Sequence, residues 1–449
     1  MRKQLFLFFY SFISIVSAQT EDIILFDDFY FLEEMVKDVT ESSRIYPNQE
    51  LPNPFGRNNT GGVLIRPGGR DTYPAFWIRD YAMSIETGFI DTDEQKHMLF
   101  LTASTQCDQT WITRSGKGMI PMGAIADHIL VETSLPIYYP GTYDYEIQED
   151  NESQFGLFPP YSDQFFFIKM AYLYVKNSGD VEILKTEINE ISLIDRLELA
   201  FKVPPVRNGS HLVYTTEAFL GVDFGFRDAE KITGNLAFPS IMKYSAAIEL
   251  AYLFEKQKDM QKSKKYKSIA AQLKKEIPNT FMNTDGMLYA STGLSKQADV
   301  WSTALAVYLD IFENESEVKA CLHLEQAYVE GRLSYKGNIR HIIKGEDFSN
   351  TSAWEISKVG INNYQNGAYW GTPTGWVAYA IAKVNINHAA LLVKEFVDDL
   401  RENDYRKGPE FGAPYECMYP DGYIRGPVYL TTVSCPYIVL KSLRKDKKN

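Results

Sequence analysis

The residues best suited to acid chemistry lie around position 223. They read Gly221-Val222-Asp223-Phe224-Gly225-Phe226-Arg227-Asp228, so a carboxyl group lies beside aromatic rings and near a guanidinium. Poor solvation raises the pKa of a carboxyl group toward the range in which it can donate a proton. Asp223 is therefore the candidate general acid. An equally supported interpretation is that Asp223 and Asp228 only cap a helix and pair with Arg227.

A second stretch, at residues 73–81, combines an aromatic ring with charges at the start of a predicted helix. Trp77 could stack on a sugar ring, while Arg79 and Asp80 could bind neighbouring hydroxyl groups. For Asp80 alone, an ion pair near the positive end of the helix is the alternative. The stretch indicates a carbohydrate subsite.

Three further loops repeat this combination of aromatic and polar residues. One contains several tyrosines and looks like a subsite wall, one ends at a helix entry rich in tryptophan, and the last contains a glutamate. The residues concerned are Tyr138, Tyr139, Tyr143 and Tyr145, then Tyr369, Trp370 and Trp376, and finally Glu416.

The elements that must position these residues are helices. Apolar residues spaced three to four apart, together with turn signals, predict twelve of them. They cover residues 25–41, 77–91, 92–105, 161–177, 181–202, 237–256, 259–282, 298–311, 314–328, 372–383, 386–402 and 428–444.

The connections between these helices alternate in length. Very short ones, at 91/92, 178–180, 257–258, 312–313 and 384–385, separate long ones at 42–76, 106–160, 203–236, 283–297, 329–371 and 403–427. If each short turn joins two antiparallel helices, every long loop falls on the same face. The sequence therefore predicts an all-α fold, a (α/α)6 barrel of six helical hairpins, with its functional site on the long loops.

Ordered in this way, the motifs resemble those of a known family. The run Gly221-Val222-Asp223-Phe224-x-x-Arg227 is similar to the Gly-Trp-Asp-Phe-x-x-Arg signature of trehalases and the related processing α-glucosidases, which are six-hairpin glycosidases. Val222 stands where that family usually has Trp. The helix entry 369–376 and the stretch 415–422 look like two further family motifs, although in the second the Glu-to-Tyr spacing is one residue longer.

The resemblance implies an inverting glycoside hydrolase. In that family the Asp of the first signature protonates the leaving oxygen, and the Glu before the last helix activates water. Here these residues would be Asp223 and Glu416, and inversion needs their carboxyl groups ~6.5 to 9.5 Å apart. Trp77, Arg79, Asp80, Arg227, Tyr369, Trp370 and Trp376 would bind the substrate.

Other residues compete for these roles. Glu217 is the closest rival as acid and Glu410 as base, and Asp299 and Glu355 are further loop carboxylates. No cofactor and no catalytic metal are expected, because the loop histidines His128, His211 and His341 form no ligand set. Loop carboxylates such as Asp144 or Asp150 could still hold a structural Ca²⁺ ion.

The N-terminus and the composition address compartment and partners. Residues 1–18 combine two cations, a short apolar run and small residues at a cleavage position, which predicts a signal peptide and a periplasmic or secreted protein. Residues 19–449 would then form one catalytic domain without a membrane anchor. The net charge of -12 argues against nucleic acid as a partner. Sequence cannot pair the four cysteines, among which Cys417 with Cys435 is one option.

The predicted function is hydrolysis of α-linked glucosides or related oligosaccharides. Two alternatives keep the barrel or the ligand and change the chemistry. A sugar lyase or epimerase would need a Tyr/His or His pair, and a non-catalytic carbohydrate-binding protein would have one carboxylate pointing away from the site.

Overall fold

The computed structural model describes residues 22–53, 55–70, 72–112, 119–138, 160–215 and 221–446. Several predictions therefore lie outside the described residues. These are the signal peptide, the loop tyrosines at 139, 143 and 145, the Ca²⁺ candidates Asp144 and Asp150, and the rival acid Glu217.

The described part of the chain is mainly helical, as predicted. Each predicted helix corresponds to one in the structure, although one begins much later than predicted. The helices are α1 (Phe26–Ser42), α2 (Ile78–Ser84), α3 (Thr92–Ser104), α5 (Tyr161–Ser178), α6 (Leu193–Lys202), α7 (Ala237–Lys256), α8 (Met260–Phe281), α9 (Val300–Tyr308), α10 (Asn314–Val329), α11 (Thr374–Ala382), α12 (Ile386–Glu402) and α13 (Leu430–Asp446).

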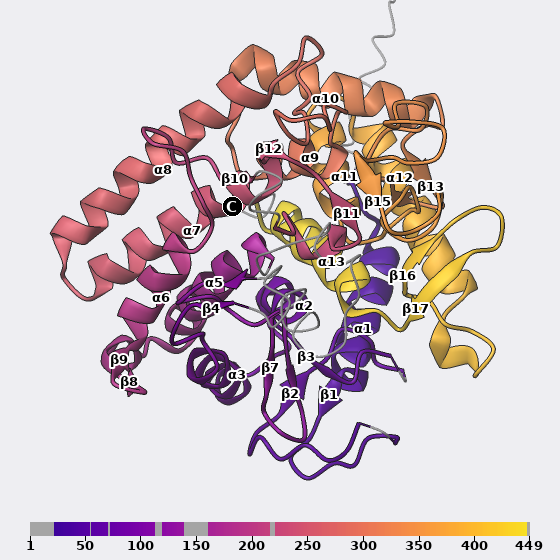
Figure 1. Cartoon of the computed structure of the whole chain (residues 1–449). Coiled ribbons are helices and arrows are strands. Elements are labelled where there is room, and N and C mark those ends of the chain that lie inside the picture. The colour runs from indigo at the N-terminus through magenta and orange to yellow at the C-terminus, as the bar shows by residue number, and fades with distance from the viewer. Residues whose placement is uncertain are drawn as a thin grey trace, which may run out of the picture.

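Alternate helices form a closed inner ring. Going round it, α2 packs on α5, α5 on α7, α7 on α9, α9 on α11, α11 on α13, and α13 returns to α2. The remaining helices pack outside this ring, among them α8 against α7, α12 against α11 and α1 against α13. In Figure 1, α13 runs through the middle of the molecule and α8 lies along its edge. The predicted (α/α)6 barrel is confirmed.

Composition explains which helices are inside. The inner helix α9 reads Val-Trp-Ser-Thr-Ala-Leu-Ala-Val-Tyr and is buried on nearly all sides. The outer helix α8 instead carries lysines around a single buried stripe that includes Tyr266, Leu273 and Phe281. A helix that is apolar all round belongs in a core, and one with a single stripe belongs on a surface.

The helix predicted over 181–202 is wrong in its first half. Only Leu193–Lys202 is α-helical, and a hairpin of β8 (Glu187–Ile188) and β9 (Ile191–Ser192) precedes it. The two residues between these strands, Asn189 and Glu190, have φ of 48° and 65°, which a helix cannot contain. The side chain of Ser192 then accepts a hydrogen bond from the amide of Asp195 and starts the helix.

Short antiparallel ladders, which the helical pattern did not predict, hold the long loops together. The first four are β1 (Arg44–Ile45) with β2 (Leu64–Ile65), β3 (Ala75–Trp77) with β6 (His128–Leu130), β6 with β7 (Pro136–Ile137), and β4 (Trp111–Ile112) with β5 (Met119–Ile120). The later ones are β10 (Tyr214–Thr215) with β12 (Gly234–Asn235), β11 (Glu230–Lys231) with β15 (Ile356–Ser357), β13 (Ser334–Tyr335) with β14 (Asn338–Ile339), and β16 (Tyr415–Met418) with β17 (Ile424–Pro427).

Within the described ranges, no helix is both long and apolar enough to cross a membrane. The four cysteines are all free and buried, so Cys417 and Cys435 are not bonded to each other.

Candidate active site

A pocket of about 280 Å³ opens where the inner helices begin. Its walls come from segments far apart in the chain: the strand β3 and the start of α2, the strand β6, the loop before β11, the loop after β15, and the β16–β17 hairpin. The side chains that matter below are Tyr73, Trp77, Arg79, Asp80, Asp127, His128, Asp228, Tyr364, Glu416, Arg425 and Tyr429.

Glu416 lies on β16 and is almost completely buried. Its Oε2 accepts a hydrogen bond from the Tyr73 hydroxyl at 2.6 Å and one from Arg425 Nε at 3.1 Å. The facing strand can come this close because residue 426 is glycine: a Cβ there would lie 2.6 Å from the Glu416 Cβ. Burial raises the pKa of Glu416 to about 7, and Arg425 and Tyr73 oppose that rise. The site therefore contains a carboxyl group that titrates near neutral pH.

Asp228 is the second carboxyl group at this pocket whose position suits proton transfer. It is half-buried and follows a 3-10 turn at Gly225–Arg227. The side-chain amide of Gln365 donates a hydrogen bond of 2.7 Å to Asp228 Oδ1, and the Gln365 carbonyl oxygen accepts one from the amide of Ala229. Burial raises the pKa of Asp228, and the charge of Asp228 in turn helps to raise the pKa of Glu416. The ionised Asp228 therefore makes Glu416 harder to ionise.

Arg79 and Asp80 enter the pocket together from the first turn of α2. Arg79 forms an ion pair with Asp127. Burial alone would raise the pKa of Asp127, but Arg79 and His128 outweigh it and hold that pKa at about 2. Asp80 Oδ1 accepts a hydrogen bond from the Tyr429 hydroxyl at 2.8 Å, and burial raises its pKa to about 6. The loop at 225 passes over Arg79 because it has no side chain there: a Cβ on Gly225 would lie 2.2 Å from the Arg79 side chain.

Trp77 and His128 form a stacked pair on one wall. Their rings lie 4.2 Å apart at an angle of 19°, because the two residues face each other across the β3–β6 ladder. His128 Nδ1 lies 2.6 Å from Asp127 Oδ2, and since Asp127 is ionised, Nδ1 is the nitrogen that donates. The Nε2 side of a neutral imidazole is then an acceptor.

Backbone strain marks the same wall. Tyr73 and Tyr364, which line the pocket, have φ of 54° and 44°, and the adjacent Val428 has φ of 57°. A β-branched residue such as Val428 is disfavoured in this left-handed region, and such strain gathers at functional sites. Arg425 stacks at 4.0 Å over the Tyr364 ring, so the strained residues fix the group that contacts Glu416.

The structure does not bring Asp223 to this pocket. Asp223 is 2% exposed, its Oδ1 accepts the amide hydrogen of Phe224, and Arg227 Nη1 lies 3.7 Å from its Oδ2. The same Arg227 nitrogen donates to Asp299 at 2.8 Å, and Asp299 caps α9 by accepting from the amide of Ser302. Burial raises the pKa of Asp223 to about 6. Asp223, Arg227 and Asp299 form a buried ion-pair cluster, so Asp223 does pair with Arg227 as the alternative predicted, but the helix cap is Asp299.

Three other predicted binding residues also lie elsewhere. Trp370 is fully buried and packs behind the pocket, with its ring 5.8 Å from Phe226 and 5.2 Å from Tyr364. Tyr369 is buried and stacks on Tyr419. Trp376 lines a different cavity, deeper in the barrel.

The rival carboxylates also lie apart from the pocket where the structure describes them. Glu410 is exposed, and Glu355 accepts hydrogen bonds from Thr233. Of the histidines, His341 is buried against Trp301, with ring centroids 3.9 Å apart. Across the described ranges, no group of three or more His, Cys, Asp and Glu side chains could hold a metal ion.

Sequence reasoning did not place Tyr73, Asp127, His128, Asp228, Tyr364, Arg425 and Tyr429 at this site. A usable signal existed for one of them, because Asp228 follows Arg227 within the motif that drew attention to Asp223. His128 had none, since it reaches the site through a three-residue ladder.

Comparisons with known proteins agree on the fold. No protein-family model matches the sequence, and no curated protein matches it. Among solved structures, a rhamnosidase from Klebsiella oxytoca with rhamnose bound is similar at a TM-score of 0.53 and 11% identity, over 93% of this chain and 64% of that chain.

Two further solved structures show the same likeness. A wild-type glycosidase has a TM-score of 0.52 and 11% identity, over 94% of this chain and 98% of that chain. A native α-L-rhamnosidase from Aspergillus terreus has a TM-score of 0.50 and 10% identity, over 92% of this chain and 39% of that chain. The barrel is therefore shared with glycosidases, and kinship with trehalases in particular stays a prediction.

Proposed function

We propose that the protein is an inverting glycoside hydrolase. The observation that carries the proposal is the pocket that holds both Asp228 and Glu416, each with a pKa raised by burial. A pair of carboxyl groups at a sugar-sized pocket can supply both the acid that protonates the leaving oxygen and the base that activates water. The similarity to glycosidase structures supports the same reaction class.

The hydrogen-bond partners assign the two roles. Glu416 Oε2 accepts from Tyr73 and Arg425, and such donors favour an ionised carboxylate that can take a proton from water. Asp228 Oδ1 accepts a hydrogen bond from the side-chain amide of Gln365, which leaves Oδ2 to carry a proton. Asp228 is thus the proposed general acid and Glu416 the general base, and Asp228 replaces Asp223 in the assignment. The active form has Asp228 protonated and Glu416 ionised, so the charge of Asp228, which raises the pKa of Glu416, is absent from it.

The remaining pocket residues would bind the terminal sugar. Trp77 offers a ring for stacking, and His128 Nε2 and the Asp80 carboxyl group offer hydrogen bonds to hydroxyl groups. Arg79 lies behind them, and its pairing with Asp127 holds the wall in place. We propose as substrate an oligosaccharide or glycoside ending in an α-linked glucosyl, rhamnosyl or related residue, met after export by the predicted signal peptide.

A matched screen tests the proposal. The purified protein should release sugar from one of a set of α-glucosides and α-L-rhamnosides, and the Asp228→Asn and Glu416→Gln variants should not. Proton NMR of the first product should show the anomer opposite to that of the substrate. A product of retained configuration would contradict inversion, and a protein that binds sugars without releasing any would be the non-catalytic alternative.

One observation favours a second candidate, a sugar epimerase or lyase. The structure brings a Tyr/His combination, Tyr73 and the Asp127-oriented His128, into the same pocket. Such a pair could abstract a carbon-bound proton. Incubation of candidate sugars in D₂O decides between the two, because epimerisation or elimination exchanges or removes that proton and hydrolysis leaves it in place.

A further inference from the structure

A second cavity, of about 80 Å³, lies on the barrel axis and is separate from the pocket described above. Residues from all six inner helices and the turns that end them line it. They are Met83, Glu86, Phe166, Lys169, Phe238, Met242, Ser245, Leu305, Tyr308, Leu309, Trp376, Cys435, Ile438 and Val439.

Five of the lining residues form a layer at one depth in the barrel. Glu86, Lys169, Ser245, Tyr308 and Ile438 each lie eight positions after the first residue of α2, α5, α7, α9 and α13, respectively. At ~1.5 Å per residue, this layer is ~12 Å below the helix starts where Asp80 and Tyr429 line the active-site pocket. The cavity and the active-site pocket share no lining residue, so a ligand here would not contact Asp228 or Glu416.

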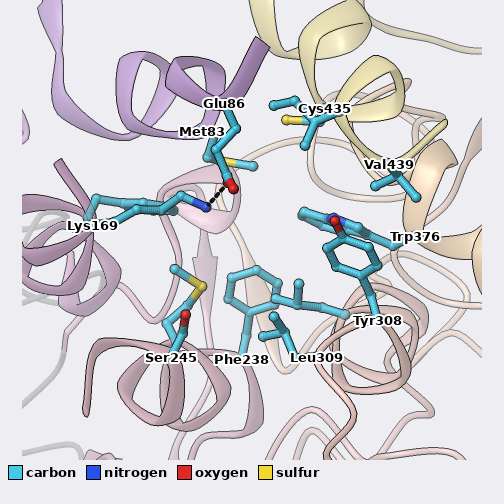
Figure 2. Close-up of a pocket in the computed structure, with 14 residues that line it drawn as sticks. Met83, Glu86, Lys169, Phe238, Ser245, Tyr308, Leu309, Trp376, Cys435 and Val439 are labelled. Carbon is cyan, nitrogen blue, oxygen red and sulfur yellow. Dashed lines mark ion pairs between the residues drawn. The ribbon is translucent and has the colours of Figure 1, made fainter. Parts of the chain in front are cut away.

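Polar groups converge on this otherwise apolar space. Figure 2 shows Lys169 and Glu86 pointing toward each other on one side and the rings of Trp376 and Tyr308 on the other. The ion pair measures 2.7 Å. Trp376 is 8% exposed, and none of the described residues accepts a hydrogen bond from its indole Nε1, whose N–H therefore remains available.

The ion pair of Lys169 with Glu86 carries no net charge. Burial raises the pKa of the nearby Glu249, which accepts a hydrogen bond from Ser245, to about 7, so this carboxyl group is only partly ionised near neutral pH. A charged ligand would leave one of these groups uncompensated. An uncharged ligand fits the balance, and the rings of Phe166, Phe238 and Trp376 suit an aromatic body.

We propose that this axial cavity is a second binding site, for a small uncharged aromatic alcohol. Its ring would lie among the aromatic side chains, and its hydroxyl would accept from the Trp376 indole N–H and donate to the Glu86 carboxylate. The volume matches this class: one water occupies ~10 to 15 Å³ on the same measure, so the cavity holds roughly five to eight non-hydrogen atoms.

Phenol and toluene, which have nearly the same shape, test the proposal on the full-length protein. Titration followed by calorimetry should show one saturable phenol site, and excess phenol should raise the melting temperature. Toluene should bind ~2- to 10-fold more weakly, since it lacks the hydroxyl. Trp376→Phe should weaken phenol binding by a similar factor and leave toluene binding unchanged. Absence of saturable binding up to ~10 mM phenol would overturn the proposal.

Two variants separate this site from the active-site pocket, whose aromatic walls could also hold phenol. Ser245→Leu fills the cavity and should weaken phenol binding at least 10-fold, while Glu416→Gln should leave phenol binding unchanged. The reverse pattern would place phenol in the active-site pocket and overturn the proposal. If Ser245→Leu melts below the wild type, Met242→Phe fills the same space and serves in its place.

Discussion

Asp223 and Asp228 belong to one short loop, but they lie in different surroundings in the barrel. Both have a pKa raised by burial. Asp223 faces inward to Arg227 and Asp299 and ties the loop to the start of α9. Asp228 comes after the 3-10 turn, lines the pocket with Glu416 and receives the Gln365 amide. Because burial raises both pKa values, the proposal of Asp228 as the acid rests on its access to the pocket.

The same contrast explains why both carboxyl groups matter. A buried ion-pair cluster holds a loop in place, and the loop in turn presents its next carboxyl group to the solvent side. Arg227 links the two roles, support of the loop and presentation of the carboxyl group, because it pairs with Asp299 and is followed directly by Asp228. Four predictions, each with its control variant, test this division between support and chemistry.

The largest effect is expected from Asp228→Asn. The amide keeps the shape of the side chain and removes the proton, so kcat for substrates with poor leaving groups should fall by ~10² to 10⁴-fold. Glycosyl fluorides need little protonation and should lose much less. Asp223→Asn is the matched control and should keep kcat within a few-fold of the wild type. A ~10²-fold loss in Asp223→Asn, with unchanged melting, would return the acid role to Asp223.

Asp299→Ala should lower the free energy of unfolding. It leaves the fully buried Arg227 without its 2.8 Å partner and removes the cap of α9, and the loss of one partner of a buried pair costs about 3–5 kcal/mol. Urea unfolding measures this cost. Asp223→Asn, whose oxygen lies 3.7 Å from Arg227, should lower the free energy of unfolding by less. Equal losses of unfolding free energy in the two variants would mean that both carboxyl groups stabilise the loop to the same extent.

The sequence predicted the architecture well because periodicity and loop length report on it directly. An all-round apolar segment such as Val300–Tyr308 must be internal, and alternating short and long connections indicate hairpins. The predicted helix over 181–202 failed where two residues of positive φ, Asn189 and Glu190, interrupt the pattern.

The site was predicted only in part, for a different physical reason. Trp77 and Asp80 lie at a helix entry and Glu416 lies in the last long loop before α13, and a loop pattern can locate both places. Which side of a loop faces the pocket depends on its turns, and the 3-10 turn at Gly225–Arg227 decides between Asp223 and Asp228. His128 and Arg425 are brought to the pocket by short β-ladders, and the sequence alone does not predict the register of these ladders.

Tyr73→Phe should shift the pH dependence of kcat/KM. Glu416 acts ionised, so activity should be lost as the pH falls through its pKa of about 7. Removing the 2.6 Å hydrogen bond from Tyr73 destabilises the ionised form and raises that pKa, which moves the acid limb upward by roughly one unit. Tyr429→Phe removes a donor to Asp80 instead and should leave this limb in place. A limb that does not move in Tyr73→Phe would show that Glu416 is not the base.

The smallest effect on activity is expected from Trp77→Ala. This variant compares the pocket wall with the buried aromatic residues around Arg227. Trp77 is half-buried and stacks on His128, so Trp77→Ala should lower kcat/KM by about 10-fold, the upper value for one aromatic contact, with little change in melting temperature. Trp77→Phe should recover most of that loss because a ring remains to stack on sugar.

Trp301, fully buried against Phe224 and His341, should behave in the opposite way: Trp301→Phe should lower the melting temperature and leave kcat/KM of the folded enzyme nearly unchanged. If Trp77→Ala instead unfolds the protein while Trp301→Phe loses activity at constant stability, then the catalytic groups face the buried cluster, and the assignment of Asp228 over Asp223 fails with it.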